Sequence, residues 1–231
     1  MRLTIFGANG PTGRLLTSHA LTAGHDVVAV TRRPAEFPLT HDRLTTLEGD
    51  VFSLPSVEAA VAGGDAVLST LGVPYSKHLI TTYSVGTANI VAAMRRYGIR
   101  RLAVVSSSAV DPRPYADAGF LFNRVLQPYL TRVMGRTLYD DMRAMESLLS
   151  TTELDWTIVR PSGLYTSSTV TDYTVVEGRA EGRFTSRADL AACLLRLAED
   201  GGHIRETVSV VTTSDNPGLL QLIRSEALGK H

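Results

Sequence analysis

The sequence predicts an α/β fold in which helices cover both faces of a doubly wound parallel sheet. Short apolar runs alternate with helical patterns across residues 1–107, which is typical of successive right-handed βαβ units. The run Asp26–Thr31 is apolar at almost every position, as expected for a parallel strand that is covered on both faces. A glycine-rich turn at residues 7–13 separates the first apolar run from the first helical pattern. Together these features favour a sheet of the Rossmann type.

The first half of the chain divides clearly into strands and helices. We expect strands at residues 2–6, 26–31, 44–47, 66–69 and 102–106, and helices at residues 11–23, 56–62 and 79–97. Gly24 and Gly98 follow two of these helices, at the position where glycine commonly ends a helix. No internal repeat or low-complexity segment interrupts this half of the sequence.

An insert at residues 111–136 makes the second half less regular. Pro112, Pro114 and Pro128 interrupt its apolar helical fragments. Connections of this length are usually lids or binding elements, although the aromatic residues of this one could equally belong to the core.

Beyond the insert, the sequence again shows defined elements. We expect helices at 137–150, 186–197 and 218–228, and strands at 155–160 and 207–211. Short strands at 173–176 and 183–185 are expected to pair with each other around the turn at 177–182. Ser186 and Asp189 resemble a capping box at the start of their helix. We therefore predict a single domain over residues 1–231, in which residues 162–231 contribute a small C-terminal substrate lobe.

The composition limits the classes of partner. With 23 basic and 23 acidic side chains, the formal net charge is zero, which argues against nucleic acid or an anionic membrane as a partner. The single cysteine, Cys193, cannot form an internal disulfide, and its apolar neighbours indicate a buried residue in a reducing compartment. No apolar stretch approaches the ~20 residues that span a bilayer, and we expect no signal peptide because the sequence opens on an expected strand. We therefore expect a soluble, cytoplasmic protein that binds a small molecule.

The turn at residues 7–13 is the strongest functional motif. Gly7, Gly10 and Gly13 have the spacing that allows a tight turn, a close approach to a phosphate and close packing of the next helix. The free N–H groups at the start of that helix favour the pyrophosphate of a dinucleotide. A glycine turn without a ligand is the alternative, but the strand before it and the helix after it favour nucleotide binding. The predicted contacts are Gly7, Asn9, Gly10, Pro11, Thr12 and Gly13.

The end of the second strand indicates which dinucleotide is bound. In a NAD site, an acidic residue at this position accepts hydrogen bonds from the ribose 2′-hydroxyl. This chain has Thr31, Arg32 and Arg33 there, and guanidinium groups suit the 2′-phosphate of NADP. The alternative is that both arginines are merely solvated. The missing acid and the two cations predict NADP(H) rather than NAD(H).

Further candidate contacts follow the later strands, because the carboxyl ends of such strands line the ligand crevice. Asp50 could accept a hydrogen bond from the adenine amino group while Val51 packs on the ring, or Asp50 could cap a turn. The candidates at the ends of the fourth and fifth strands are Thr70, Leu71, Gly72 and Ser106.

These motifs resemble the atypical short-chain dehydrogenases/reductases, in particular the NmrA-like and flavin/biliverdin-reductase-like branch. The resemblance lies in residues 7–13, 49–51, 86–90, 104–108, 154–161 and 186–191, which span nearly the whole chain in the family order. It implies a Rossmann domain that holds NADP(H) by the glycine turn, the arginine after the second strand, the Asp-Val pair and the Leu-Gly turn. It also implies that Pro161 approaches the nicotinamide end.

The parent superfamily uses a Tyr-x-x-x-Lys dyad, and Tyr139 with Arg143 looks like that motif. Arginine keeps its proton above pH ~12 and differs in shape from lysine, so it replaces lysine poorly. In extended members of that superfamily, the dyad lysine precedes a glutamate of the same helix by four residues. Counting back from Glu146 puts Met142 at the lysine position and Leu138 at the tyrosine position, and both belong to the apolar face of the helix. We therefore expect no dyad of this kind, and we interpret Tyr139 and Arg143 as a surface pair.

The chemistry beyond cofactor binding has few candidate residues. Ser107 and Ser108 could bind a substrate or cofactor oxygen, or could simply close the hydrogen bonds of their turn. None of the six histidines has a metal-type spacing with another ligand, so we expect no metal. A bound nicotinamide supplies the hydride itself, and water or the substrate can supply a proton.

Three functions are compatible with this site, and fold alone does not choose between them. We favour an NADP(H)-dependent reductase of a small conjugated acceptor, such as a flavin or a quinone. The alternative is a non-catalytic NADP(H)-binding redox sensor of the NmrA type, which would have a protein partner. An epimerase or dehydratase with bound NAD ranks last, because it needs the dyad and an acidic end to the second strand.

Overall fold

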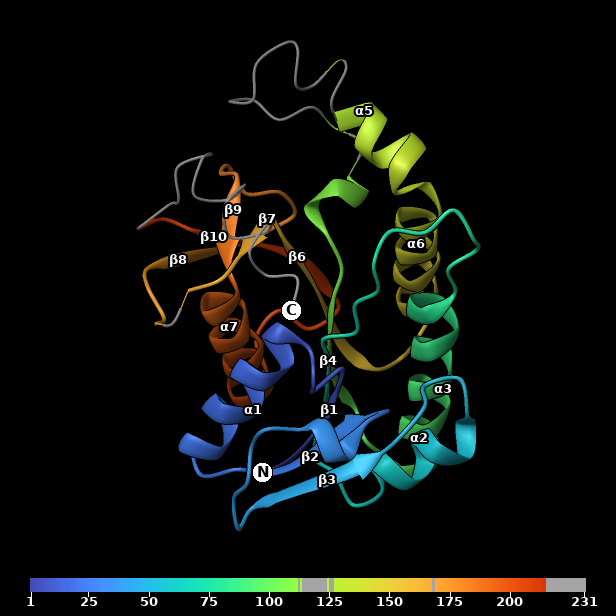
Figure 1. The fold of residues 1–231 in the computed structure, drawn as a ribbon, viewed down its shortest axis with the longest axis vertical. Coiled ribbons are helices and arrows are strands. Elements are labelled where there is room, and N and C mark those ends of the chain that lie inside the picture. Colours follow the sequence, from blue (N-terminus) through green and yellow to red (C-terminus); the bar gives the residue numbers. More distant parts are fainter. Residues whose placement is uncertain (112, 114–123, 125–126, 168, 215–231) are drawn as a thin grey trace.

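The computed structural model of the protein describes residues 1–111, 113, 124, 127–167 and 169–214, and an eight-stranded sheet forms its centre (Figure 1). The strand order is β3-β2-β1-β4-β5-β6-β10-β8. These strands are β1 (Arg2–Phe6), β2 (Asp26–Thr31), β3 (Leu44–Glu48), β4 (Ala66–Ser69), β5 (Arg101–Val105), β6 (Asp155–Pro161), β8 (Tyr173–Glu177) and β10 (Glu206–Thr212). Neighbouring strands are parallel, except that β10 and β8 are antiparallel. The order confirms the doubly wound Rossmann sheet that the sequence predicts.

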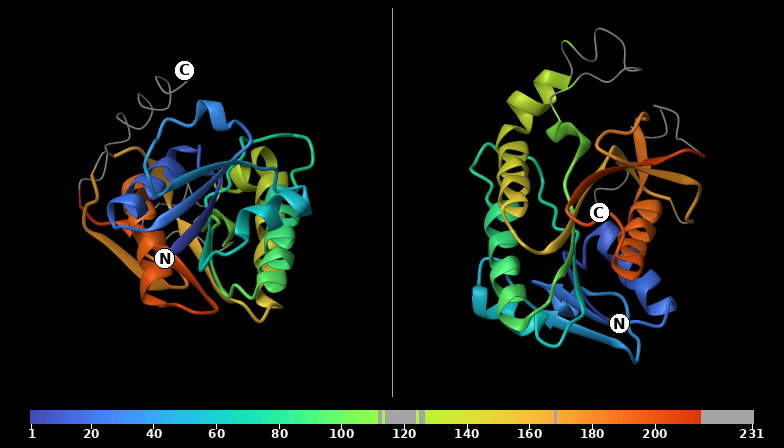
Figure 2. Two further views of the ribbon diagram at one scale, coloured as in Figure 1. Left: turned by 90° about the horizontal axis from the view of Figure 1, so that it is seen from below. Right: turned by 180° about the vertical axis from the view of Figure 1, so that it is seen from behind.

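Helices cover both faces of this sheet (Figures 1 and 2). One face carries α1 (Pro11–Thr22) and α7 (Arg187–Asp200), which pack against each other, and the other carries α2 (Leu54–Val61), α3 (Thr82–Tyr97) and α6 (Arg136–Ser150). The shorter elements are η1 (Pro34–Glu36), η2 (Ser108–Val110), α5 (Gln127–Tyr129), η4 (Leu130–Met134), β7 (Gly163–Tyr165) and β9 (Phe184–Ser186). In the part of the chain that the structure describes, no helix combines the length and the apolar character that crossing a bilayer requires.

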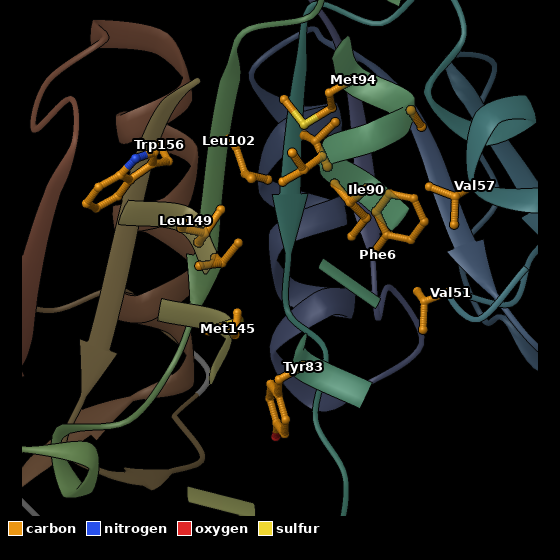
Figure 3. Close-up of a cluster of buried hydrophobic side chains, with 14 of the residues drawn as sticks. Phe6, Val51, Val57, Tyr83, Ile90, Met94, Leu102, Met145, Leu149 and Trp156 are labelled. Carbon is orange, nitrogen blue, oxygen red and sulfur yellow. The ribbon is translucent and has the colours of Figure 1, made fainter. Parts of the chain in front are cut away.

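Two hydrophobic cores lie on the two faces of the sheet. Successive side chains of a strand point to opposite faces, so Leu3 and Ile5 of β1 pack beneath α1 and α7, whereas Phe6 packs beneath α3 with Ile90 (Figure 3). This two-sided burial explains why the strands are apolar at nearly every position. Cys193 of α7 is fully buried, as predicted, and burial raises the pKa of its thiol to about 12.

The strand order reverses between β1 and β4. The chain runs outward from β1 through β2 to β3, and then returns to β4 on the other side of β1. The carboxyl ends of β1 and β4 therefore lead to connections that diverge, and this divergence leaves a crevice in which ligands of such folds bind. The turn after β1 and the turn after β4 are tied together, because the Thr70 N–H donates a hydrogen bond to the Phe6 carbonyl oxygen at 2.9 Å.

One expected strand pairing is wrong. The sequence suggests a hairpin between residues 173–176 and 183–185, but β8 pairs with β10 and β9 pairs in parallel with β7. The connection between β8 and β9 lacks the tight two-residue turn that specifies a hairpin. The edge of β10 instead offers β8 a five-residue register, from Val208 with Glu177 to Thr212 with Tyr173. Half of the 111–136 insert and the whole of the expected helix at 218–228 lie outside the described residues.

Candidate functional site

A pocket of about 610 Å³ opens at the carboxyl ends of β1, β2, β4 and β5. It lies over the point where the strand order reverses, between the start of α1 and the start of α3. The residues predicted from the sequence that line it are Gly7, Asn9, Gly10, Pro11, Thr12, Thr31, Arg32, Asp50, Val51, Thr70, Leu71, Gly72 and Ser106. The structure therefore gathers most of the predicted contacts into one cavity.

The glycine turn is shaped by two close backbone contacts. Gly7 has a φ of +75°, and a Cβ on it would lie 2.7 Å from the carbonyl carbon of Thr70. A Cβ on Gly13 would clash with the Gly7 carbonyl oxygen and would lie 2.8 Å from the Cα of Ala8. Gly13 does not line the pocket, so its role is to let α1 approach the turn. Each contact requires glycine for a different reason.

The turn also has a polar side chain of fixed orientation. The Asn9 side-chain oxygen accepts a hydrogen bond from the Arg14 Nε–H at 2.9 Å. The Thr70 hydroxyl donates to the carbonyl oxygens of Phe6 and Gly7 at 3.1 Å and 3.2 Å. These bonds hold the turn between α1 and β4, while the backbone N–H groups at the start of α1 border the pocket.

The two arginines after β2 differ in where they point. Arg32 lines the pocket, and no ion pair within the described part of the chain includes it. Arg33 lies outside the lining, where its side chain is 69% exposed and its guanidinium pairs with Glu36 at 3.0 Å. The side chain of Thr31 is occupied by the backbone, since its hydroxyl accepts from the Arg33 N–H at 3.2 Å. The pocket therefore contains one cation at the end of β2.

Asp50 and Val51 form the rim of the pocket after β3. The Asp50 carboxylate accepts a hydrogen bond from the Phe52 N–H at 3.0 Å, so the turn-capping interpretation holds, and Asp50 also lines the pocket. Val51 is buried, and the Asn89 side-chain amide donates to its carbonyl oxygen at 2.7 Å. A Cβ on Gly86 would lie only 3.1 Å from the Val51 side chain. Helix α3 thus fixes this rim.

Apolar side chains form another part of the lining, and the sequence did not reveal three of them, Tyr83, Val105 and Met142. The members of this apolar wall include Val73, Tyr83, Val105, Met142 and Leu164. These five residues come from a loop, two helices and two strands that are far apart in the sequence, so no single local motif predicts the set. Burial raises the pKa of the Tyr83 hydroxyl to about 12, which makes it a poor proton donor.

The start of α3, which borders this wall, is anchored by a buried carboxylate. Asp141 of α6 accepts hydrogen bonds from the Tyr83 N–H at 2.8 Å and from the Ser84 N–H at 3.2 Å, and also from the Ser84 hydroxyl. A carboxylate at a helix N-terminus satisfies donors that have no partner within the helix. Asp141 therefore fixes α3 relative to α6.

Ser106 lines the pocket, and a hydrogen bond to Glu146 orients its hydroxyl. Its hydroxyl donates to the Glu146 carboxylate at 2.6 Å, and Arg160 donates to the same carboxylate at 2.5 Å and 3.0 Å. Because the Ser106 proton is committed to Glu146, its oxygen can accept a hydrogen bond from a ligand. Asp111 lies 4.0 Å from Arg160, and hydrogen bonds from Arg113 lower the pKa of this carboxyl to about 2.

Three other predicted contacts lie outside the lining. Ser107 accepts a hydrogen bond from the Ala109 N–H at 3.2 Å, so it closes its own turn. Ser108 is buried in the short η2 helix, and Pro161 is buried at the end of β6. Among the described residues, no group of three or more His, Cys, Asp and Glu side chains could hold a metal ion.

The expected surface pair on α6 is wrong. Tyr139 is buried, and its hydroxyl lies 2.9 Å from that of Tyr75, whereas Arg143 pairs with Asp140 at 2.7 Å. The loop that carries Tyr75 covers this side of the helix, which the helical period alone does not reveal. Neither Tyr139 nor Arg143 lines the pocket.

Comparisons with known proteins agree with this geometry. A family model described as NAD(P)H-binding matches residues 7–201. An uncharacterized protein of Mycobacterium tuberculosis is 36% identical over 114 residues, and the match covers 49% of this chain but only 13% of the relative.

Two solved structures share the fold. A short-chain dehydrogenase/reductase from Veillonella parvula, in complex with NADP, is 21% identical, with a TM-score of 0.77 over 92% of this chain and 95% of that one. ChuY, an anaerobillin reductase from Escherichia coli O157:H7, is 22% identical, with a TM-score of 0.72 over 94% and 100%. The family model agrees with the NAD(P)H-binding character that the sequence motifs indicate, and the two solved structures share the fold.

The packing of Gly13 leads to a stability prediction. We expect Gly13→Ala to lower the free energy of unfolding by about 1–3 kcal/mol, because the new methyl group must displace the backbone of the turn. The matched control is Gly72→Ala, whose Cβ would meet no atom within 4 Å. Thermal melts of both variants test this, and equal melting temperatures for the two would contradict it.

Proposed function

The chain belongs to the NAD(P)H-binding family, and we propose that it is an NADP(H)-dependent reductase of a small conjugated acceptor. The observation that carries the proposal is Arg32, which lines the pocket at the end of β2 where an acidic residue would select NAD. The NADP complex of the Veillonella structure and the reductase activity in the name of ChuY support the two parts of the proposal.

The pocket suits a dinucleotide along its whole length. Close backbone packing at Gly7 and Gly13 keeps the turn tight beside the pocket, so backbone N–H groups at the start of α1 can approach a pyrophosphate. In our proposal, Val51 packs on the adenine and Arg32 binds the 2′-phosphate with charge-assisted hydrogen bonds. The nicotinamide end would lie toward Leu71, Gly72 and Ser106. When bound there, NADPH supplies a hydride.

The protein's own residues would position the acceptor rather than protonate it. The wall formed by Val73, Met142 and Leu164 is apolar and suits a flat conjugated ring. Ser106 offers an accepting oxygen, and Tyr83 has a pKa of about 12. We therefore propose that water or the acceptor supplies the proton, which is possible for flavins and quinones. Leu164 reaches the pocket from the C-terminal part, in keeping with a substrate lobe formed by residues 162–231.

A non-catalytic NADP(H) sensor is the second candidate. It is favoured by the position of Tyr139 and Arg143, which lie outside the lining and leave the pocket without the tyrosine of the parent superfamily. A sensor would bind reduced and oxidised cofactor with comparable affinity and would retain a protein partner in pull-down experiments.

The cofactor preference can be tested at the end of β2. We expect Arg32→Ala to weaken NADPH binding by about tenfold to a hundredfold, because a charge-assisted contact to the 2′-phosphate is lost, and to leave NADH binding unchanged. Arg33→Ala is the matched control, since Arg33 pairs with Glu36 outside the pocket and should have little effect. Calorimetric titration measures the NADPH and NADH affinities of the wild type and of both variants. An unchanged ratio of NADPH to NADH affinity in Arg32→Ala would show that this arginine does not select NADP(H).

Turnover requires a separate test. We expect the wild-type protein to accelerate NADPH oxidation with at least one member of a panel of flavins and quinones, measured as the loss of NADPH absorbance. The rate without protein is the control. Tight NADPH binding with no acceleration by any acceptor would refute the reductase proposal and favour the sensor.

A further inference from the structure

Arg187 reaches the pocket from the opposite end of the chain. It is the first residue of α7, and its Nη1 atom lies 3.5 Å from the hydroxyl oxygen of Thr12, in the first turn of α1. Both residues line the pocket. Helices α1 and α7 lie side by side (Figure 1), and each begins at this pocket. The guanidinium is therefore held beside the glycine turn.

The backbone that carries Arg187 is fixed by buried hydrogen bonds. Ser186 caps α7 by accepting from the Asp189 N–H at 3.0 Å, and its own N–H donates to the Thr212 hydroxyl at 2.8 Å. Asp189 is fully buried and accepts from the Thr171 N–H at 2.7 Å and from the Thr212 hydroxyl at 2.5 Å. The start of α7 thus has little freedom to move away from α1.

The two arginines of the lining occupy different regions of it. Arg32 follows β2 near Asp50 and Val51, whereas Arg187 lies over the start of α1. The turn residues from Gly7 to Thr12 that border Arg187 carry no charged side chain. An anion held by the N–H groups of α1 would therefore meet a cation on its other side.

We propose that Arg187 binds the pyrophosphate of the dinucleotide, opposite the glycine turn, and raises the affinity for every dinucleotide irrespective of its 2′-phosphate. This inference rests on the proposed function, because it assumes that NAD(P)H occupies the pocket. It assigns the two cations separate tasks: Arg32 discriminates between cofactors, and Arg187 strengthens binding of both. It also makes the C-terminal half of the chain part of the cofactor site.

Three ligands separate these tasks: NADPH, NADH and adenosine 2′-monophosphate, which lacks a pyrophosphate. We expect Arg187→Met to weaken NADPH and NADH by the same factor, about tenfold to a hundredfold, and to leave adenosine 2′-monophosphate unchanged. Arg32→Ala should show the reverse pattern, with NADPH and adenosine 2′-monophosphate weakened and NADH unchanged. The matched control is Arg196→Met on the same helix, because Arg196 is half-exposed and pairs with Asp200 away from the pocket.

A second variant guards against a folding defect. Arg187→Lys keeps the charge but not the planar fork, so it should melt like the wild type and show a smaller loss for both dinucleotides. Unchanged NADPH and NADH affinities in Arg187→Met would overturn the inference and leave the proposed function intact. An equal loss for adenosine 2′-monophosphate would also overturn it, because the effect would then not depend on the pyrophosphate. Wild-type protein that binds neither dinucleotide would instead refute the proposed function, and the inference with it.

Discussion

The contact between the start of α1 and the turn after β1 is the constraint on which the site depends. Gly13 places the helix so close to Gly7 and Ala8 that a single methyl group would not fit between them. Residues 10–12 at the start of α1 line the pocket, and the first N–H groups of a helix have no acceptor within the helix. Thr70 ties the same turn to β4 on its other side. The shape of the turn beside the pocket is therefore set by backbone packing, and the side chains add to it.

The remaining walls are positioned by helices that hold one another. Asn89 and Gly86 of α3 fix the rim at Val51, and Asp141 of α6 fixes the start of α3. On the other face, α7 packs on α1 and brings Arg187 to the same cavity. The site thus draws on both layers of helices, and a change in either layer alters the pocket without touching its glycine turn.

Sequence reasoning located the features that are encoded in a local pattern. The strands of the first half, the glycine turn and the arginine after β2 all depend on neighbours within a few residues, so periodicity and spacing reveal them. It failed where partners are distant. The helical pattern predicts that Tyr139 is exposed, but the loop of Tyr75 covers it. Strand β8 pairs with the edge of β10 and not with β9, which follows it in the sequence. Met142 reaches the pocket only through the tertiary fold.

This division has a physical meaning for the proposed chemistry. The half of the pocket that suits the cofactor is built from short segments whose geometry few residue types can provide, with Gly7 as the extreme case. The half that would face the acceptor is built from apolar side chains on several elements, and many residues of similar volume could replace them. The part of the pocket proposed for the cofactor can therefore be predicted from a single sequence. The proposed choice of acceptor depends instead on the combined shape of Val73, Met142 and Leu164. An apolar wall beside the Ser106 hydroxyl, whose oxygen can accept a hydrogen bond, favours acceptors that are recognised mainly by their shape.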